Sequence, residues 1–371
     1  MHRGRLLTVG LAVATAVGIT LPATGASAGA AKGPFLQTNL VSDGFVTAQI
    51  VDPQLKNPWG LSSSSGSPMW VSDNNAGVTT LYNLTVSPTQ KVGLTVTIPP
   101  GKGSPPGSTG SPTGTVFNPN NDFQITKGGT TGKALFIFAT EDGAIAAWKG
   151  DADINNAVLP VDNSTATDST GDIGAVYKGL AMGSIGSANF LYAANFRFGT
   201  VDVFDGSFNL INSFTDPKIP AGYAPFGIQV LNNVLYVTYA KQNALKHDDV
   251  AGQGHGFVDA FDLKGNLLDR LVSHGQLDSP WGLAIAPASF GDFAGDLLVA
   301  NFGNGRINAY TPDKGNFRGQ LESSSGPIVI DGLWGLRVGN GGAGGEANKI
   351  YFSAGINGEN DGLVGSIEKV G

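Results

Sequence analysis

The sequence has no cysteine and few charged residues. Without cysteine, disulfide bonds and thiolate metal sites are excluded, so stability must come from a large buried core. Charged residues make up only 14% of the chain, the net charge is −7 and no basic run occurs, which argues against nucleic acid or anionic lipid as a partner. Residues 29–371 also lack a Gly-x-Ser-x-Gly elbow, a His-Glu-x-x-His zinc motif and a phosphate-binding loop.

Long apolar runs are missing too, except near the N-terminus. Arg3 and Arg5 precede an uncharged apolar stretch over residues 6–21, and Ala26-Ser27-Ala28 matches a small-residue cleavage site. The alternative is a permanent membrane anchor, but the stretch is short for a bilayer and is interrupted by Gly and Thr. We therefore expect residues 1–28 to be a signal peptide. Residues 29–371 would be secreted to the outside of the cell as one domain, with no membrane insertion after cleavage.

The abundant residue is glycine, with 55 copies, and one glycine belongs to a repeated element. The element reads Trp-Gly-Leu, often after proline, at residues 58–61, 280–283 and 333–336, with weaker copies at 225–228, 177–180 and 113–116. Each copy is followed by an apolar run and then by a glycine-led stretch in which apolar and polar residues alternate, as in residues 201–205. Six copies about 50 to 65 residues apart predict an all-β, six-bladed β-propeller.

The two ends of the chain are expected to close the ring. Residues 39–42 (NLVS) precede the first copy much as residues 270–273 (RLVS) precede the fifth, so an N-terminal strand has the character of an outer fourth strand. The sixth blade runs out of chain after its third strand. Pairing of the N-terminal strand with that third strand would complete the blade and leave no open edge in the ring.

Several segments resemble a known family. They are residues 57–61 (NPWGL), 287–293 (PASFGDF) with 301–307 (NFGNGRI), and 333–336 (LWGL) through 361–363 (DGL). They are similar to uncharacterised secreted bacterial propellers, some of which carry a PEP-CTERM sorting tail that this chain lacks. The likeness covers nearly all of residues 29–371 and implies the propeller without implying an activity. More distantly, the blades resemble NHL-type and streptogramin-lyase-type propellers, a class that includes enzymes, metal sites and binding scaffolds.

Polar residues follow the second strand of several blades, on the side where the Trp-Gly elements also lie. Both sets should surround one mouth of the central channel. Oxygen donors from four blades, Asp73, Glu141, Asn195 and Asn301, could hold Ca²⁺ or another divalent ion, which in turn could polarise an ester or lactone carbonyl. The alternative, which we favour, is that these side chains cap strand ends and bond turn amides.

Two further groups of residues are candidates at this mouth. His247 and His255 share the longest loop, residues 240–256, and could supply a general acid or base; the alternative, which we favour, is a solvated loop. Ligand-binding candidates at the mouth are Trp59, Arg197, Trp281, Arg306 and Trp334. Because the tryptophans recur at one place in the repeat, blade-to-blade packing is the stronger interpretation for them.

Two function classes therefore stay open. The first is a secreted propeller that binds an extracellular ligand or protein on the channel-mouth face, and it is favoured by the missing catalytic signatures. Two insertions rich in Pro, Gly, Ser and Thr, residues 99–112 and 162–172, are expected to form mobile loops on that face. The alternative is a metal-assisted hydrolase or lyase with a divalent ion at the central channel.

Overall fold

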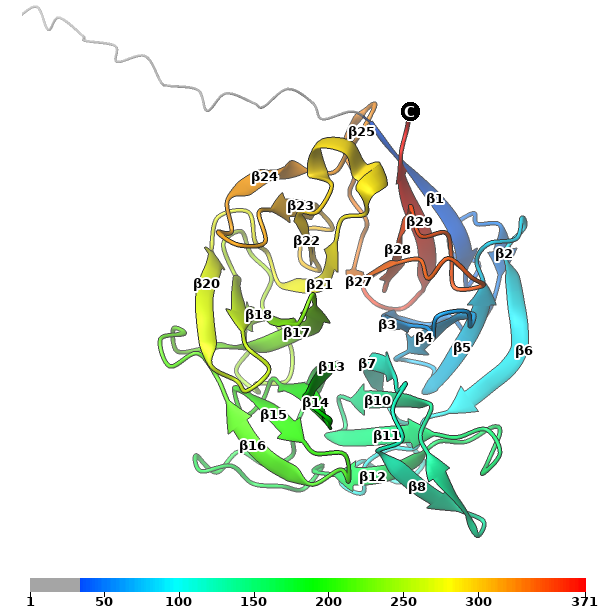
Figure 1. Cartoon of the computed structure of the whole chain (residues 1–371), viewed down its shortest axis with the longest axis vertical. Coiled ribbons are helices and arrows are strands. Elements are labelled where there is room, and N and C mark those ends of the chain that lie inside the picture. Colours follow the sequence, from blue (N-terminus) through cyan, green and yellow to red (C-terminus); the bar gives the residue numbers. More distant parts are fainter. Residues whose placement is uncertain (1–33) are drawn as a thin grey trace, which may run out of the picture. The chain divides into compact units, whose positions relative to one another are not determined.

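The computed structural model describes residues 34–371, and the predicted signal peptide, residues 1–28, lies outside them. Over residues 34–371 the chain is almost entirely β, with one short 3-10 helix, η1 (Ala288–Phe293). No helix within this range is long and apolar enough to cross a membrane. Figure 1 shows six sheets arranged as blades around a common axis, which confirms the predicted six-bladed propeller.

Each blade is a sheet of antiparallel strands, except for a short parallel pairing of β1 with β2 at the outer edge of blade 6, and the first strand of each blade lies nearest the axis (Figure 1). Blade 1 contains β3 (Pro58–Ser62), β4 (Met69–Asp73), β5 (Val78–Asn83) and β6 (Gln90–Thr97). Blade 2 contains β7 (Pro112–Phe117), β10 (Phe136–Thr140), β11 (Ala144–Trp148) and β12 (Val158–Asp162), with a side hairpin of β8 (Gln124–Lys127) and β9 (Thr130–Lys133). Blade 3 contains β13 (Tyr177–Ile185), β14 (Ala188–Asn195), β15 (Thr200–Phe204) and β16 (Leu210–Phe214).

The second half of the ring repeats this order. Blade 4 contains β17 (Tyr223–Leu231), β18 (Val234–Lys241), β19 (Phe257–Phe261) and β20 (Leu267–Ser273). Blade 5 contains β21 (Pro280–Ile285), β22 (Leu297–Asn301), β23 (Ile307–Tyr310) and β24 (Phe317–Gln320), followed by the small hairpin β25 (Glu322–Ser323) and β26 (Gly326–Pro327). Blade 6 contains β27 (Leu333–Val338), β28 (Ile350–Ala354) and β29 (Leu363–Lys369), and its outer strands are β1 (Phe35–Ser42) and β2 (Ile50–Val51).

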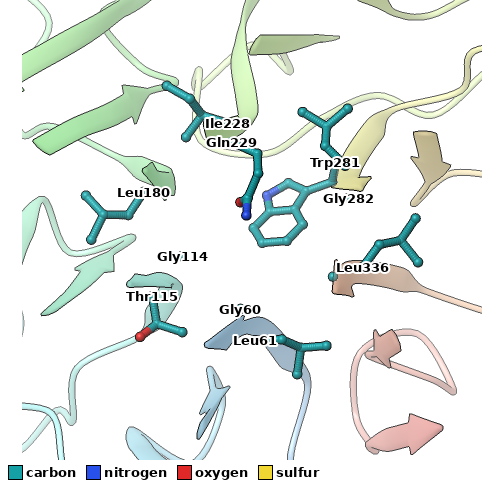
Figure 2. A pocket seen from close by; sticks show the side chains of 12 residues that line it. Gly60, Leu61, Gly114, Thr115, Leu180, Ile228, Gln229, Trp281, Gly282 and Leu336 are labelled. Carbon is teal, nitrogen blue, oxygen red and sulfur yellow. The ribbon is translucent and has the colours of Figure 1, made fainter. Parts of the chain in front are cut away.

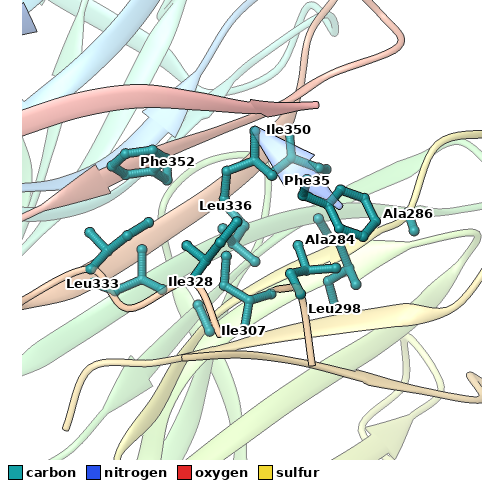
Figure 3. Close-up of a cluster of buried hydrophobic side chains, with 14 of the residues drawn as sticks. Phe35, Ala284, Ala286, Leu298, Ile307, Ile328, Leu333, Leu336, Ile350 and Phe352 are labelled. Atoms are coloured by element: carbon teal, nitrogen blue, oxygen red, sulfur yellow. The ribbon is translucent and has the colours of Figure 1, made fainter. Parts of the chain in front are cut away.

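The closure of the ring by the N-terminal strand is confirmed. β1 pairs antiparallel with β29, from Phe35 opposite Lys369 to Ser42 opposite Leu363. Phe35 is buried and packs on two phenylalanines of η1, with ring centroids 5.0 Å from Phe290 and 6.1 Å from Phe293. Figure 3 shows Phe35 within the apolar cluster between blades 5 and 6. The short helix therefore supports the closing strand from the neighbouring blade.

The Trp-Gly element is a β-bulge at the start of the inner strand. In four blades the pairing with the second strand skips the aromatic-glycine pair, between residues 58 and 61, 225 and 228, 280 and 283, and 333 and 336. A bulge kinks the strand and redirects its side chains. In blades 4 and 6 a hydroxyl group of the second strand, from Thr238 or Ser353, accepts from the amide of the glycine and donates to a carbonyl of the next blade. Thr238 accepts a hydrogen bond from the Gly227 amide (2.8 Å) and donates to the Pro280 carbonyl (2.6 Å).

The glycines of the six elements form a closed chain of contacts around the axis. A Cβ on any of them would come within 3.0 Å of the backbone of the next blade's inner strand. The partners run in order around the ring: Gly60 meets Thr113, Gly114 meets Leu180, Gly179 meets Phe226, Gly227 meets Trp281, Gly282 meets Trp334 and Gly335 meets Trp59. Glycine is needed here because neighbouring backbones approach too closely for any side chain.

One buried carboxyl lies away from the axis, in blade 4. Asp259 on β19 is fully buried, and neither of its side-chain oxygens has a hydrogen-bond partner. The Arg270 guanidinium is 3.5 Å away but is paired with Asp216. Burial, with a smaller effect of Asp269, raises the pKa of Asp259 to about 7.

We predict that Asp259→Asn stabilises the protein at pH 8 but not at pH 4. The pKa of Asp259 is higher in the folded than in the unfolded state. The contribution of this carboxyl group to the stability of the fold is therefore fully present below about pH 4, where the group is neutral in both states, and is lost as the pH rises through about 7. The amide stays neutral, so the free energy of unfolding at pH 8 should rise by roughly 2–4 kcal/mol. Urea unfolding at both pH values measures this difference. An equal effect of the substitution at pH 4 and pH 8 would contradict it.

Candidate functional site

The predicted tryptophans meet at the axis of the ring. Trp59 of blade 1 stacks on Trp334 of blade 6 with centroids 3.5 Å apart, and Trp281 of blade 5 meets both edge-on at 6.0 and 5.8 Å. Phe302 stacks on the Trp334 ring at 3.9 Å. Trp59 and Trp334 are each only 1% exposed, so the prediction that these indoles form a ligand surface at the mouth does not hold. They form an aromatic plug through packing between blades, as the alternative interpretation predicted.

Next to this plug the central channel is nearly filled. The remaining cavity has a volume of about 20 Å³, which is room for about one water molecule. It is lined by the inner strands, and Figure 2 shows the side chains of Gln229 and Trp281 projecting toward its middle. A small-molecule ligand therefore does not fit in this cavity.

One blade replaces the plug aromatic with a charged residue. Lys178 on β13 stands where blades 1, 5 and 6 have tryptophan and blade 4 has phenylalanine, and it is 2% exposed. Its ammonium lies over the rings of Trp59 and Phe196, 5.2 and 5.9 Å from their centroids. Its backbone carbonyl accepts a hydrogen bond from Trp281 Nε1 at 2.8 Å. The lysine is therefore held at the axis, on the aromatic plug.

The Lys178 ammonium is neutralised by carboxylates from two other blades. It donates to Glu141 Oε1, in the turn after β10 of blade 2, and to Asp248 Oδ1, in the long loop of blade 4, at 3.3 Å. Burial lowers the pKa of Lys178, but the nearby carboxylates raise it more, so the net shift is upward. Glu141 also accepts a hydrogen bond from Asn74 Nδ2 at 2.8 Å. The lysine therefore joins three blades electrostatically.

His247 adjoins this ion-pair cluster. Its Nδ1 lies 2.8 Å from Asp248 Oδ1, and this hydrogen bond together with the charge of Lys178 lowers the pKa of Asp248. One potential ligand atom each from Glu141, His247 and Asp248 lies within 4.8 Å of the others. Such an arrangement orients an imidazole by a carboxylate, as in both acid–base and metal sites. We call Glu141, Lys178, His247 and Asp248 the mouth cluster.

Beside the mouth cluster lies an open pocket of about 380 Å³. Its walls come from the loops between blades and from the turns after the second strands: Gly103, Ser104, Pro105, Ser111, Glu141, Asp142, Ser164, Gly174, Ala175, Arg197 and His247. Arg197 is fixed by two hydrogen bonds from Nη1 to the carbonyls of Ile173 (2.8 Å) and Gly174 (2.9 Å). Burial raises the pKa of Asp142, whose oxygens accept hydrogen bonds from Ser104 Oγ and the Ser111 amide. We call this space the mouth pocket.

Three of the four predicted metal ligands are engaged in their own blades. Thr80 on β5 donates to Asp73 at 2.7 Å. Asn195 donates to Asp202 on β15 at 2.9 Å and accepts from the Val176 and Phe198 amides. Asn301 donates to the Gln276 carbonyl at 2.8 Å and to Asn304. Asp73 Oδ1 and Asn301 Oδ1 are buried oxygens without a hydrogen-bond partner among the described residues, so the ion shared by alternate blades stays a prediction.

Of the predicted histidine and arginine candidates, one of each lines the mouth pocket and one of each does not. His247 lines the mouth pocket, whereas His255 Nδ1 bonds the Val250 carbonyl at 2.8 Å and is not among the lining residues. Arg197 also lines it, whereas Arg306 reaches Gln320 of its own blade at 3.4 Å. Sequence reasoning missed Lys178 and Asp248 as site residues. The sequence does contain a signal for Lys178, because it is a lysine at the repeat position where four other blades have an aromatic residue.

Comparison with known proteins places this geometry in context. No family model matches the chain. The uncharacterised protein R648 of Acanthamoeba polyphaga mimivirus is 32% identical over 338 residues, which cover 89% of this chain and 79% of that protein. Protein L690 of the same virus is also 32% identical, over 89% of this chain and 84% of its own length. The expected bacterial family with a sorting tail receives no support from these viral relatives.

Solved structures share the fold at low identity. Virginiamycin B lyase from Staphylococcus aureus is 14% identical with a TM-score of 0.51, covering 91% of this chain and 99% of the lyase. A gluconolactonase from Xanthomonas campestris is 10% identical with a TM-score of 0.50, covering 85% and 87%. The aldose sugar dehydrogenase of Streptomyces coelicolor is 12% identical with a TM-score of 0.51, covering 91% and 98%. These likenesses confirm the resemblance to streptogramin-lyase-type propellers at the level of the fold.

Proposed function

The chain belongs to the family of the mimivirus proteins R648 and L690, and we propose that it binds a small polar ligand in the mouth pocket. The observation that carries this proposal is the convergence of Glu141, Arg197 and His247 on a space of about 380 Å³, the size of a small-molecule site. They come from blades 2, 3 and 4. The cavity beside the aromatic plug is much smaller, at about 20 Å³, and a pocket of about 230 Å³ at the C-terminal ends of the inner strands is lined by no histidine and no carboxylate.

The lining of the pocket indicates the chemistry of the ligand. Serine hydroxyls, a guanidinium, an imidazole and two carboxyl groups offer both hydrogen-bond donors and acceptors, whereas no Phe, Tyr or Trp and no long aliphatic side chain lines the pocket. Arg197 uses Nη1 for two backbone carbonyls, which orients the rest of its guanidinium before a ligand arrives. A compact ligand rich in hydroxyl, carboxylate or carbonyl groups fits this lining.

A second candidate is a hydrolase or lyase that acts on such a ligand. The hydrogen bond between His247 Nδ1 and Asp248 favours it, because a carboxylate on one ring nitrogen leaves Nε2 free to exchange a proton with a bound molecule. His247 lines the pocket, so a bound ligand would be within reach of the imidazole. The lyase and lactonase of similar fold supply no residue-level support at 10–14% identity.

A ligand screen tests the proposal. We expect at least one compound in a panel of mono- and disaccharides, hydroxy acids and amino acids to raise the melting temperature, and to bind in titration calorimetry. Arg197→Ala should weaken that binding at least about tenfold, because it removes a preorganised donor. Arg306→Ala is the matched control, since Arg306 lies in blade 5 and does not line the pocket.

The outcomes separate the alternatives. If nothing in the panel binds, or if Arg306→Ala weakens binding as much as Arg197→Ala, the mouth pocket is not the ligand site. Conversion of the bound compound followed by NMR, and its loss in His247→Gln, would establish the hydrolase or lyase instead of simple binding.

The proposal places this binding outside the cell. Its support is the charged start, apolar stretch and Ala26-Ser27-Ala28 site of residues 1–28. We predict that the protein recovered from the culture medium begins at Gly29, as measured by intact mass. Recovery of a chain that begins at Met1 from a membrane fraction would refute secretion.

A further inference from the structure

The mouth cluster has the ligands of a metal site, but a lysine already lies among them. Glu141 and Asp248 each accept a hydrogen bond from the Lys178 ammonium, and Asp248 also bonds His247. We propose that Glu141, His247 and Asp248 form a divalent-cation site that this chain fills with its own Lys178 ammonium, and that the site binds Zn²⁺ once Lys178 is made neutral. The inference concerns a metal and does not depend on the ligand proposed for the mouth pocket.

The position of Lys178 is the first argument. The repeat places an aromatic residue here in four blades, namely Trp59, Phe226, Trp281 and Trp334. Those rings pack at the axis, whereas blade 3 brings a cation to the same place, 2% exposed and over the ring of Trp59. A buried charge is costly unless it is paired, so this departure from the repeat requires the partners that it has.

The partners are the second argument. Besides Glu141 and Asp248, the carboxyls of Asp249 and Glu359 are close enough to interact with the Lys178 charge. Asp249 Oδ2 is a buried oxygen without a hydrogen-bond partner among the described residues. Negative charge therefore exceeds the single positive charge of Lys178. Such a surplus of carboxylates around one point is the electrostatic environment of a divalent cation.

The donor set indicates the kind of ion. One imidazole nitrogen and two carboxylates, each from a side chain within 4.8 Å of the others, suit Zn²⁺ with water in a fourth position. Ca²⁺ takes six to eight oxygen ligands, so a site that includes an imidazole fits it poorly. A zinc ion on these atoms would lie next to the Lys178 ammonium, and the two positive charges would repel each other. The native chain should therefore exclude the ion.

The experiment is titration calorimetry of ZnCl₂ and CaCl₂ into the full chain without a histidine tag. We expect no stoichiometric zinc binding to the native protein, and one Zn²⁺ per chain, bound at least about 100-fold more tightly, in Lys178→Met. Ca²⁺ should show less than about a tenfold gain in the same variant. The double variant Lys178→Met with Glu141→Gln should lose the gained zinc binding. Lys246→Met is the matched control, because Lys246 pairs with Asp172 at 2.5 Å, outside the mouth cluster.

Three results would overturn the proposal. The first is a native protein that binds one Zn²⁺ and loses it in Glu141→Gln. The second is a folded Lys178→Met protein, as judged by its circular dichroism, that gains no zinc. The third is zinc binding that survives the double variant or also appears in Lys246→Met. If Lys178→Met does not fold, Lys178→Gln, which keeps a hydrogen-bond donor, takes its place in the same series, and the result for the native protein needs no variant.

Discussion

The approach of neighbouring inner strands at the six glycines is the constraint on which the rest of the structure depends. At each of these glycines a Cβ would come within 3.0 Å of the backbone of the next blade, from Gly60 against Thr113 around to Gly335 against Trp59. Backbones this close leave a channel of about 20 Å³. In blades 1, 5 and 6 the bulge beside the glycine allows the preceding tryptophan to reach the axis, where the three indoles pack together. Larger spaces lie outside this cavity: a pocket of about 230 Å³ at the C-terminal ends of the inner strands, and the mouth pocket of about 380 Å³ among the loops.

The mouth cluster follows from that constraint together with one substitution. Because the inner strands converge, the residue before each glycine points to a shared axis, and Lys178 there reaches carboxylates from blades 2 and 4. A lone buried ammonium would destabilise the fold, so Glu141 and Asp248 are needed for the lysine to be tolerated. Asp248 connects Lys178 to the loop that carries His247, and Glu141 and His247 line the mouth pocket. The ion pairs of Lys178 with Glu141 and Asp248 thus hold three blades together and lie beside the proposed ligand pocket.

The sequence was sufficient for the fold because each blade repeats a local pattern. The Trp-Gly bulge, the glycine-led third strand and the outer-strand character of residues 39–42 are local signals, and they predict the six blades and the closure of the ring. The partners of individual polar side chains could not be predicted in this way. Asn195 was predicted to lie where the second strand ends, and it is the last residue of β14. Its side-chain amide, however, donates a hydrogen bond to Asp202 on the next strand, which the pattern did not predict. Glu141 and Asp248 meet through the path of a long loop, which has no repeat to reveal it.

The central claim, that contact at the glycines sets the geometry, is tested most directly by comparing two alanine variants by urea unfolding. Gly227 in β17 lies against the Trp281 carbonyl, whereas a Cβ at Gly93 in the exposed strand β6 would meet nothing within 4 Å. The account predicts that Gly227→Ala lowers the free energy of unfolding by at least about 3 kcal/mol, while Gly93→Ala leaves it unchanged or slightly higher. Equal stability of the two variants would contradict the claim.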